Sequence, residues 1–204
     1  MTKLVIFDLD GTLLNSLQDL AMSTNYALRQ HGYPTHKLPA FRYFVGNGIN
    51  KLLERALPES ERSEENMLKI REDFVAYYAE HKADFTAPYD GICELLKDLK
   101  RRGMLLAVAS NKYHSATVAL IPEYFGEGLF DFVYGQRDGV PIKPDPTIVF
   151  DIMKEAGVLK DEVLYVGDSG VDMQTAVNSG VASVGVTWGF RDREELLKKI
   201  GRAS

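Results

Sequence analysis

Two aspartates stand one residue apart in Asp8-Leu9-Asp10-Gly11-Thr12, directly after the apolar run Leu4-Val5-Ile6-Phe7. Alternate side chains of an extended segment point the same way, so we expect the carboxylates of Asp8 and Asp10 to lie close together. Neighbouring carboxylates repel each other unless a cation or a shared proton relieves the charge. An Asp-Gly pair after a strand is also a common turn. The whole pentapeptide at the end of an apolar run is more specific and predicts a cation-dependent site.

A second acidic segment, Gly167-Asp168-Ser169-Gly170-Val171-Asp172, follows the apolar run 163–166. Ser169 and Asp172 have the spacing of a capping box, which begins a helix. Asp168 precedes that box and would lie at a strand tip, where open α/β sheets bind ligands. Mg²⁺ prefers oxygen ligands and usually binds through one or two carboxylates plus substrate phosphate and water. We therefore expect Asp168 to serve as a Mg²⁺ ligand beside the first strand.

Two further segments are candidates for holding a phosphate group. Ser110-Asn111-Lys112 follows the run 105–109, and a hydroxyl with backbone N–H groups at a helix N-terminus forms a phosphate cradle. A Ser-Asn pair before a helix is also an ordinary cap. Lys143 begins Lys143-Pro144-Asp145-Pro146, where the two prolines stiffen the loop and could aim the ammonium inward, although an isolated lysine is usually solvated.

The elements that would position these residues alternate between short apolar runs and helical patterns. This alternation predicts an α/β fold, a doubly wound parallel sheet with helices on both faces. Continuous apolar runs suit strands that are buried on both faces. The predicted strands are 4–7, 105–109, 130–133, 163–166 and 183–186, and the predicted helices between them are 92–102, 114–121, 147–156 and 192–200.

The stretch from about Ser16 to about Phe85 breaks the alternation, because it contains helical patterns only. A βαβ crossover needs one helix, so several helices imply an inserted helical subdomain. We expect one helix from the cap Ser16 to Gly32, one over 49–57 and one around 67–78. The predicted organisation is a Rossmann-like core of residues 1–15 and 86–204 and a helical cap of residues 16–85.

Composition limits the partners and the location. The chain has 204 residues, a net charge of −5 and a single cysteine, Cys93. That charge provides no basic field for nucleic acid or an anionic membrane, so we expect neither partner. One cysteine can form no intrachain disulfide, and the N-terminal apolar run is too short for a signal peptide or a membrane span. We expect a cytoplasmic monomer or homodimer.

Taken together and in this order, the segments resemble the haloacid dehalogenase-like superfamily of phosphotransferases over nearly the whole chain. The resemblance implies that Asp8 is the nucleophile and Asp10 the general acid and base, with the Asp10 backbone carbonyl also binding Mg²⁺. It implies that Asp168 is a metal ligand and Asp172 a supporting acidic position at the metal. The helical insertion falls where this superfamily has its cap.

The same resemblance assigns the phosphate-binding positions. It implies that Thr12, Ser110 and Asn111 bind the phosphate and that Lys143 neutralises its charge. Attack by Asp8 would give an aspartyl-phosphate that water then cleaves. The second aspartate argues against a dehalogenase, since a halide needs no proton to depart.

Two segments narrow the resemblance to phosphoglycolate phosphatases: Val45-Gly46-Asn47-Gly48 and Thr187-Trp188-Gly189-Phe190-Arg191. We therefore expect a Mg²⁺-dependent phosphomonoesterase for a small anionic phosphate ester such as 2-phosphoglycolate, with Gly46, Asn47 and Gly48 contacting the substrate. A pyrophosphatase, a nucleotidase or a sugar-phosphate phosphatase or mutase of the same superfamily stays open. An alternative of another class is a catalytically silent module that binds a phosphorylated metabolite.

Overall fold

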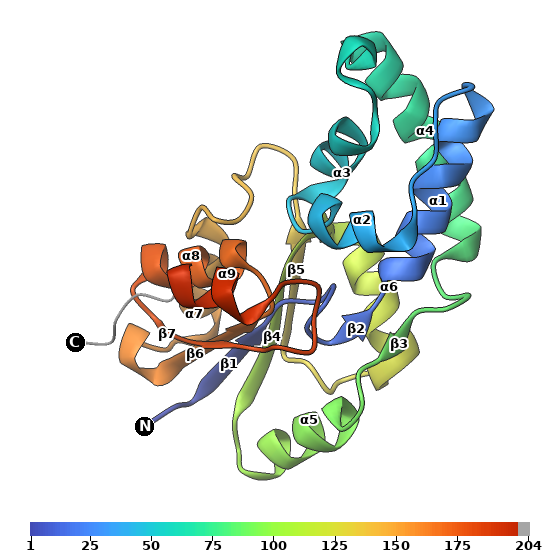
Figure 1. Ribbon diagram of the computed structural model, residues 1–204. Coiled ribbons are helices and arrows are strands. Elements are labelled where there is room, and N and C mark those ends of the chain that lie inside the picture. Colours follow the sequence, from blue (N-terminus) through green and yellow to red (C-terminus); the bar gives the residue numbers. More distant parts are fainter. Residues whose placement is uncertain (200–204) are drawn as a thin grey trace. The chain divides into compact units, whose positions relative to one another are not determined.

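The computed structural model describes residues 1–199 and divides the chain into two compact units (Figure 1). Unit 1 comprises Met1–Leu14 and Pro88–Ser204, and unit 2 comprises Asn15–Ala87. Where the chain passes between them, the short strands β2 (Leu14–Asn15) and β3 (Ala87–Pro88) form a two-stranded sheet. No helix within residues 1–199 is long and apolar enough to span a membrane.

Unit 1 is built on a five-stranded parallel sheet, as the alternation of elements predicts. The strand order is β5-β4-β1-β6-β7, which places the first strand in the middle, directly between β4 and β6. The carboxyl ends of these three strands therefore lie side by side. The strands are β1 (Leu4–Phe7), β4 (Leu105–Tyr113), β5 (Phe132–Gln136), β6 (Val163–Gly167) and β7 (Ala182–Gly185).

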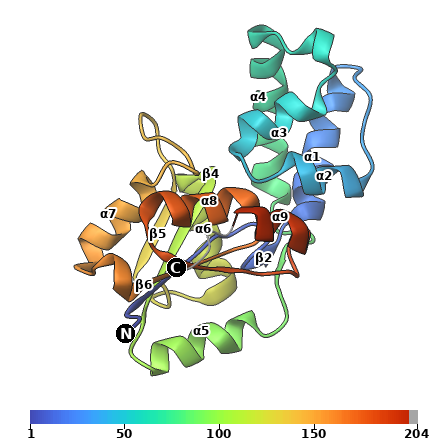
Figure 2. The same ribbon diagram turned by 60° about the vertical axis from the view of Figure 1, so that its left-hand side comes forward.

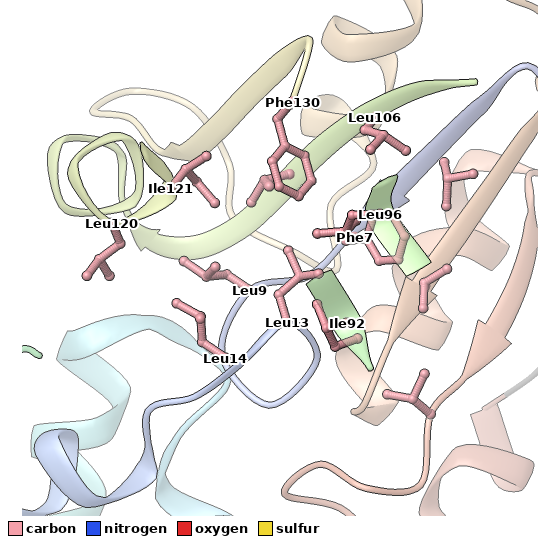
Figure 3. Packing of buried hydrophobic residues seen from close by; sticks show 14 residues of the cluster. Phe7, Leu9, Leu13, Leu14, Ile92, Leu96, Leu106, Leu120, Ile121 and Phe130 are labelled. Atoms are coloured by element: carbon pink, nitrogen blue, oxygen red, sulfur yellow. The ribbon is translucent and has the colours of Figure 1, made fainter. Parts of the chain in front are cut away.

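Helices cover both faces of this sheet (Figure 1 and Figure 2). Val5 and Phe7 pack into one hydrophobic cluster with α5 (Ile92–Arg101) and α6 (His114–Phe125), shown in Figure 3. Leu4 and Ile6 pack into the other cluster with α7 (Thr147–Ala156) and α8 (Gly170–Ser179). This division follows from the period of two along a strand. The remaining helix is α9 (Arg193–Lys199), and the predicted end of this helix at Ile200 lies outside the described residues.

Two strands, β4 and β5, differ from the predicted ones by more than one residue at an end. β4 continues to Tyr113, with a register shift between Ala109 and Tyr113, so Ser110-Asn111-Lys112 belongs to the strand and not to a helix start. β5 begins at Phe132 and not at Phe130. Asp131 comes before the strand. Its carboxylate accepts a hydrogen bond from the Leu106 N–H at 2.8 Å, and its backbone N–H donates to the Leu106 carbonyl.

Unit 2 is helical throughout apart from its short strand ends. The three predicted helices are present, and a fourth, α2, was not predicted because only Phe41 of its seven residues is buried. The carboxylate of buried Asp19 accepts the N–H (2.8 Å) and hydroxyl (2.6 Å) of Thr86, which ties the start of α1 to the returning chain. The helices are α1 (Leu17–Gln30), α2 (Leu38–Phe44), α3 (Gly48–Ala56) and α4 (Glu64–His81), with a 3₁₀ turn over Glu59–Glu61.

Helix α5 offers a direct test of the sheet-facing core. Leu96 is fully buried in the cluster of Figure 3, whereas its neighbour Leu95 is 41% exposed. Leu96→Ala should lower the free energy of unfolding by about 2–5 kcal/mol, because it removes buried contacts and leaves a cavity. Leu95→Ala, the matched control, should change it by about 0.5 kcal/mol or less. Urea denaturation followed by circular dichroism measures both, and equal losses would contradict the assignment of the two faces.

Candidate active site

Asp8 lies at the carboxyl end of the central strand and continues its alternation. Side chains two residues apart in a strand point to the same face, so the Asp8 side chain lies on the side of Leu4 and Ile6, the side of the sheet covered by α7 and α8. There its Oδ1 accepts a hydrogen bond from the Lys143 ammonium at 2.8 Å. Lys143 is only 2% exposed, so its side chain points inward, as the proline-stiffened loop suggested.

The Lys143 ammonium is surrounded by oxygens. Besides Asp8, its Nζ lies 2.7 Å from Asp172 Oδ1, 2.9 Å from the Ala109 carbonyl and 3.0 Å from the Tyr165 hydroxyl. Burial alone lowers the pKa of this ammonium, but the charges of Asp172 and Asp8 outweigh burial and raise the pKa well above its ordinary value. Lys143 is therefore a fixed positive charge.

Three buried carboxylates converge beside this lysine. Asp8, Asp168 and Asp172 each offer one oxygen, and these oxygens all lie within 4.8 Å of one another. Burial, reinforced by the charge of Asp172, raises the pKa of Asp8 well above its ordinary value and that of Asp168 to about 7. One ammonium does not balance three carboxylates, and oxygen-only donors suit a hard divalent cation. The residues present thus fit a metal, and the cluster could hold one.

Asp172 contacts Lys143 and also caps the start of helix α8. Its Oδ2 accepts the backbone N–H (3.1 Å) and the hydroxyl of Ser169, and the Ser169 hydroxyl accepts the Asp172 N–H, which confirms the predicted capping box. Its Oδ1 accepts from Lys143. With both oxygens engaged by protein donors, Asp172 mainly orients Lys143 and the helix start, whereas Asp168 has fewer such bonds.

The turn after Asp10 packs directly on Asp168. Gly11 has φ of +95°, and a Cβ there would lie 2.4 Å from Asp168 Oδ2, so only glycine fits. Thr12 is fully buried, and its hydroxyl lies 3.5 Å from Asp168 Oδ1. The Thr12 hydroxyl thus faces the carboxylate of Asp168, and its contact with a phosphate stays a prediction.

Asp10 is held apart from the three-carboxylate cluster. Both of its carboxylate oxygens lie near Lys112 Nζ, at 3.1 and 3.2 Å, in a largely buried ion pair. No role was predicted for Lys112. Its only signal in the sequence is its place directly after Ser110-Asn111, since the partnership depends on the register of β1 against β4.

Ser110 and Asn111 both lie buried at the end of β4. The Ser110 hydroxyl accepts the Lys112 N–H at 3.2 Å. The Asn111 side-chain amide pairs with the backbone of Lys143 in both directions, donating to its carbonyl (3.1 Å) and accepting its N–H (2.9 Å). Asn111 thereby fixes the lysine loop, and the phosphate-binding roles of Ser110 and Asn111 stay predictions.

Gly46, Asn47 and Gly48 belong to unit 2, at the junction of α2 and α3. Asn47 stands at the N-cap position of α3, but its side chain makes no capping hydrogen bond. Its Oδ1 instead accepts from Arg55 at 2.9 Å, and Arg55 also donates to the Phe44 carbonyl at 2.9 Å. The segment is thus held by Arg55, and its contact with a substrate stays a prediction.

Comparison with known proteins identifies the family of this chain. The profile of the haloacid dehalogenase-like hydrolases matches residues 5–186. The chain belongs to this family. Two hydrolases that it resembles are phosphoglycolate phosphatases. The one from Pseudomonas syringae pv. tomato is 38% identical over 98% of this chain and 74% of its own length. The one from Mannheimia succiniciproducens is 34% identical over 92% of this chain and 87% of its own length.

A solved structure of a similar protein has the same fold. The crystal structure of a predicted phosphoglycolate phosphatase from Haemophilus somnus 129PT superposes with a TM-score of 0.90 at 31% identity. The match covers 97% of this chain and 91% of that chain. The α/β fold and the family membership predicted from the sequence are therefore confirmed.

The raised carboxyl pKa values predict how pH affects the metal-free protein. Asp168 has a pKa of about 7 in the folded chain against the ordinary 3.8, so the folded state binds a proton that the unfolded state releases over this range. The free energy of unfolding contributed by Asp168 should fall as pH rises from about 4 to about 7. A Mg²⁺ ion bound at this cluster would take the place of the proton, so Mg²⁺ should raise the melting midpoint more at about pH 8 than at about pH 5.

Thermal melts in EDTA and in excess Mg²⁺ measure this effect, with Asp168→Asn as the control. The variant should lose this pH-dependent contribution and most of the shift caused by Mg²⁺. An equal Mg²⁺ shift at both pH values in the wild-type protein would contradict the prediction.

Proposed function

We propose that this protein is a Mg²⁺-dependent phosphatase that cleaves small phosphate esters through a covalent intermediate on Asp8. The observation that carries the proposal is the contact between Asp8 and the buried Lys143 ammonium within the three-carboxylate cluster. A nucleophilic carboxylate must be ionised. The Lys143 ammonium favours that form, whereas burial and the charge of Asp172 raise the pKa of Asp8, so a bound cation would be needed to complete the ionisation. The relatives named phosphoglycolate phosphatase support the same type of reaction.

In the first step, an Asp8 oxygen attacks phosphorus in line with the ester oxygen. A phosphorus–oxygen bond forms to Asp8 while the bond to the leaving group breaks, and Asp10 gives the leaving oxygen a proton. Lys143 offsets negative charge on the transferring phosphoryl group. Both Asp10 oxygens pair with Lys112 in this structure, so Asp10 must leave that ion pair and gain a proton before it can act as the acid.

In the second step, water attacks the phosphorus of the aspartyl-phosphate and Asp10 accepts a proton from it. The phosphorus–oxygen bond to Asp8 breaks, which releases inorganic phosphate and restores the carboxylate. When bound by Asp8, the Asp10 carbonyl and Asp168, with Asp172 in support, Mg²⁺ would neutralise charge on the phosphoryl oxygens.

The two aspartates should be separable by leaving group. Asp8→Asn should abolish turnover and covalent labelling with every ester, because no nucleophile remains. Asp10→Asn should lower kcat for alkyl phosphates by about 10²–10⁴-fold. The loss should be much smaller for p-nitrophenyl phosphate, whose leaving group barely needs a proton. Steady-state kinetics with both esters measure this, and circular dichroism checks folding. Equal losses with both esters would remove Asp10 from the acid role.

For the substrate, we propose 2-phosphoglycolate, supported by the names of the relatives and by the Gly46-Asn47-Gly48 segment. The first amides of α3 carry no side-chain cap, and such amides bind anions such as the carboxylate of this ester. The kcat/KM for 2-phosphoglycolate should exceed that for ethyl phosphate by about 10-fold or more, the worth of one charge-assisted hydrogen bond.

Replacing Asn47 tests that assignment. Asn47→Leu should erase the preference for 2-phosphoglycolate and leave the activity on p-nitrophenyl phosphate unchanged, because it removes the hydrogen bond between Arg55 and Asn47 and disturbs the turn. Asn50→Leu, at an exposed position of the same helix, is the matched control and should keep the preference. If pyrophosphate or a nucleoside monophosphate were the better substrate, the phosphatase proposal would stand and the phosphoglycolate assignment would fall.

The other expectations accompany this proposal. We place the protein in the cytoplasm as a monomer or homodimer, without nucleic acid or membrane as a partner. A catalytically silent binding module is disfavoured because Asp8, Asp10, Lys143 and Asp168 are all present. Phosphate release from p-nitrophenyl phosphate distinguishes the two functions directly.

A further inference from the structure

The segment between β7 and α9 lies against both turns that carry the acidic residues. It starts where the Val186 N–H donates to the Gly167 carbonyl at 2.9 Å. The indole N–H of Trp188 then donates to the Thr12 carbonyl at 3.1 Å, in the turn after Asp10. The Phe190 N–H donates to Asp168 Oδ2 at 2.7 Å. One short segment thus holds both the turn after β1 and the acidic side chain after β6.

Gly189 stands between these two contacts and leaves no room for a side chain. A Cβ at this position would lie 2.3 Å from the Cβ of Asp168 and 2.4 Å from the Gly11 carbonyl oxygen. Neither atom is the end of a flexible side chain. The close approach of this backbone to Asp168 therefore requires glycine, and any larger residue must move either the segment or the acidic turn.

The Phe190 hydrogen bond also sets the rotation of the Asp168 carboxylate. Oδ2 accepts this short bond, whereas the contact of Oδ1 within residues 1–199 is the long one of 3.5 Å with the Thr12 hydroxyl. A hydrogen bond to one oxygen of a carboxylate also fixes the direction in which the other oxygen points. Loss of a hydrogen-bond donor that orients a metal ligand in this way typically lowers the metal affinity by about 10–100-fold.

We infer that Trp188, Gly189 and Phe190 form a positioning element that holds Asp168 and the Asp10–Thr12 turn ready for the cation. The inference rests on the proposed function for the presence of the metal. It assigns no contact with metal or substrate to these three residues. Their effect passes through the backbone N–H of Phe190 and the indole of Trp188.

The test is a calorimetric Mg²⁺ titration of the wild-type protein and three variants in the absence of substrate. Gly189→Ala should weaken Mg²⁺ binding by about 10-fold or more, because it displaces the Phe190 N–H from Asp168. Trp188→Phe removes the indole N–H and keeps an aromatic ring, and it should weaken binding by about 2–10-fold, the worth of one hydrogen bond. Thr187→Ala, at an exposed position next to the element, is the matched control and should bind Mg²⁺ as the wild type does.

If the element had a purely structural role, Gly189→Ala would have a lower melting midpoint and an unchanged Mg²⁺ affinity. That result would overturn this inference and leave the proposed function standing. Wild-type protein that binds no Mg²⁺ would overturn the proposed metal dependence and this inference with it. If Gly189→Ala fails to fold, Trp188→Phe decides, and unchanged Mg²⁺ affinity in that variant overturns the inference.

Discussion

Three carboxylates share one buried space with a single ammonium, and much of the surrounding structure serves to hold that ammonium in place. Lys143 lies on a loop, yet Asn111 pairs with its backbone while Tyr165 and the Ala109 carbonyl contact its Nζ. Removing one partner of a buried charge leaves the others uncompensated, at a cost of about 3–5 kcal/mol. The lysine, its loop and the carboxylates therefore form one interdependent set, and a cation completes the balance of charge.

The sheet supplies this set through its strand order. With β1 between β4 and β6, Asp8 and Asp168 follow neighbouring strand ends and Ser110 lies in the last part of β4, although the three are far apart in the sequence. Because side chains alternate along β1, Phe7 packs among leucines on one face of the sheet, and Asp8 points to the other face, toward Lys143. The turns pack so closely that Gly11 and Gly189 are required at their contact with Asp168. The geometry of the acidic cluster is thus a property of the backbone as much as of its side chains.

Sequence patterns identified the residues whose chemistry is local. Asp8, Asp168 and the capping box of Ser169 and Asp172 follow apolar strands directly, and short-range rules suffice to place them. Lys112 and Tyr165 were missed because their partners depend on the register of β1 against β4 and β6. The pairing of the Asn111 amide with a loop 32 residues further along was not predicted, because no local pattern indicates it, and the contact of Asn111 with phosphate stays a prediction. Helix α2 was missed because it buries one side chain and so shows no periodicity.

The central position of β1 also has a consequence for how the chain is made. Its neighbours begin at Leu105 and Val163, so the first strand leaves the ribosome long before either partner exists. The helices of residues 15–87 emerge next and contact one another, and they can collapse while the strand waits. Non-local parallel pairing is slow, and unpaired apolar strands aggregate. Leu4-Val5-Ile6-Phe7 is therefore the strand of this sheet that stays longest without a partner during synthesis, and a chain that stops before Asp168 has no complete acidic cluster.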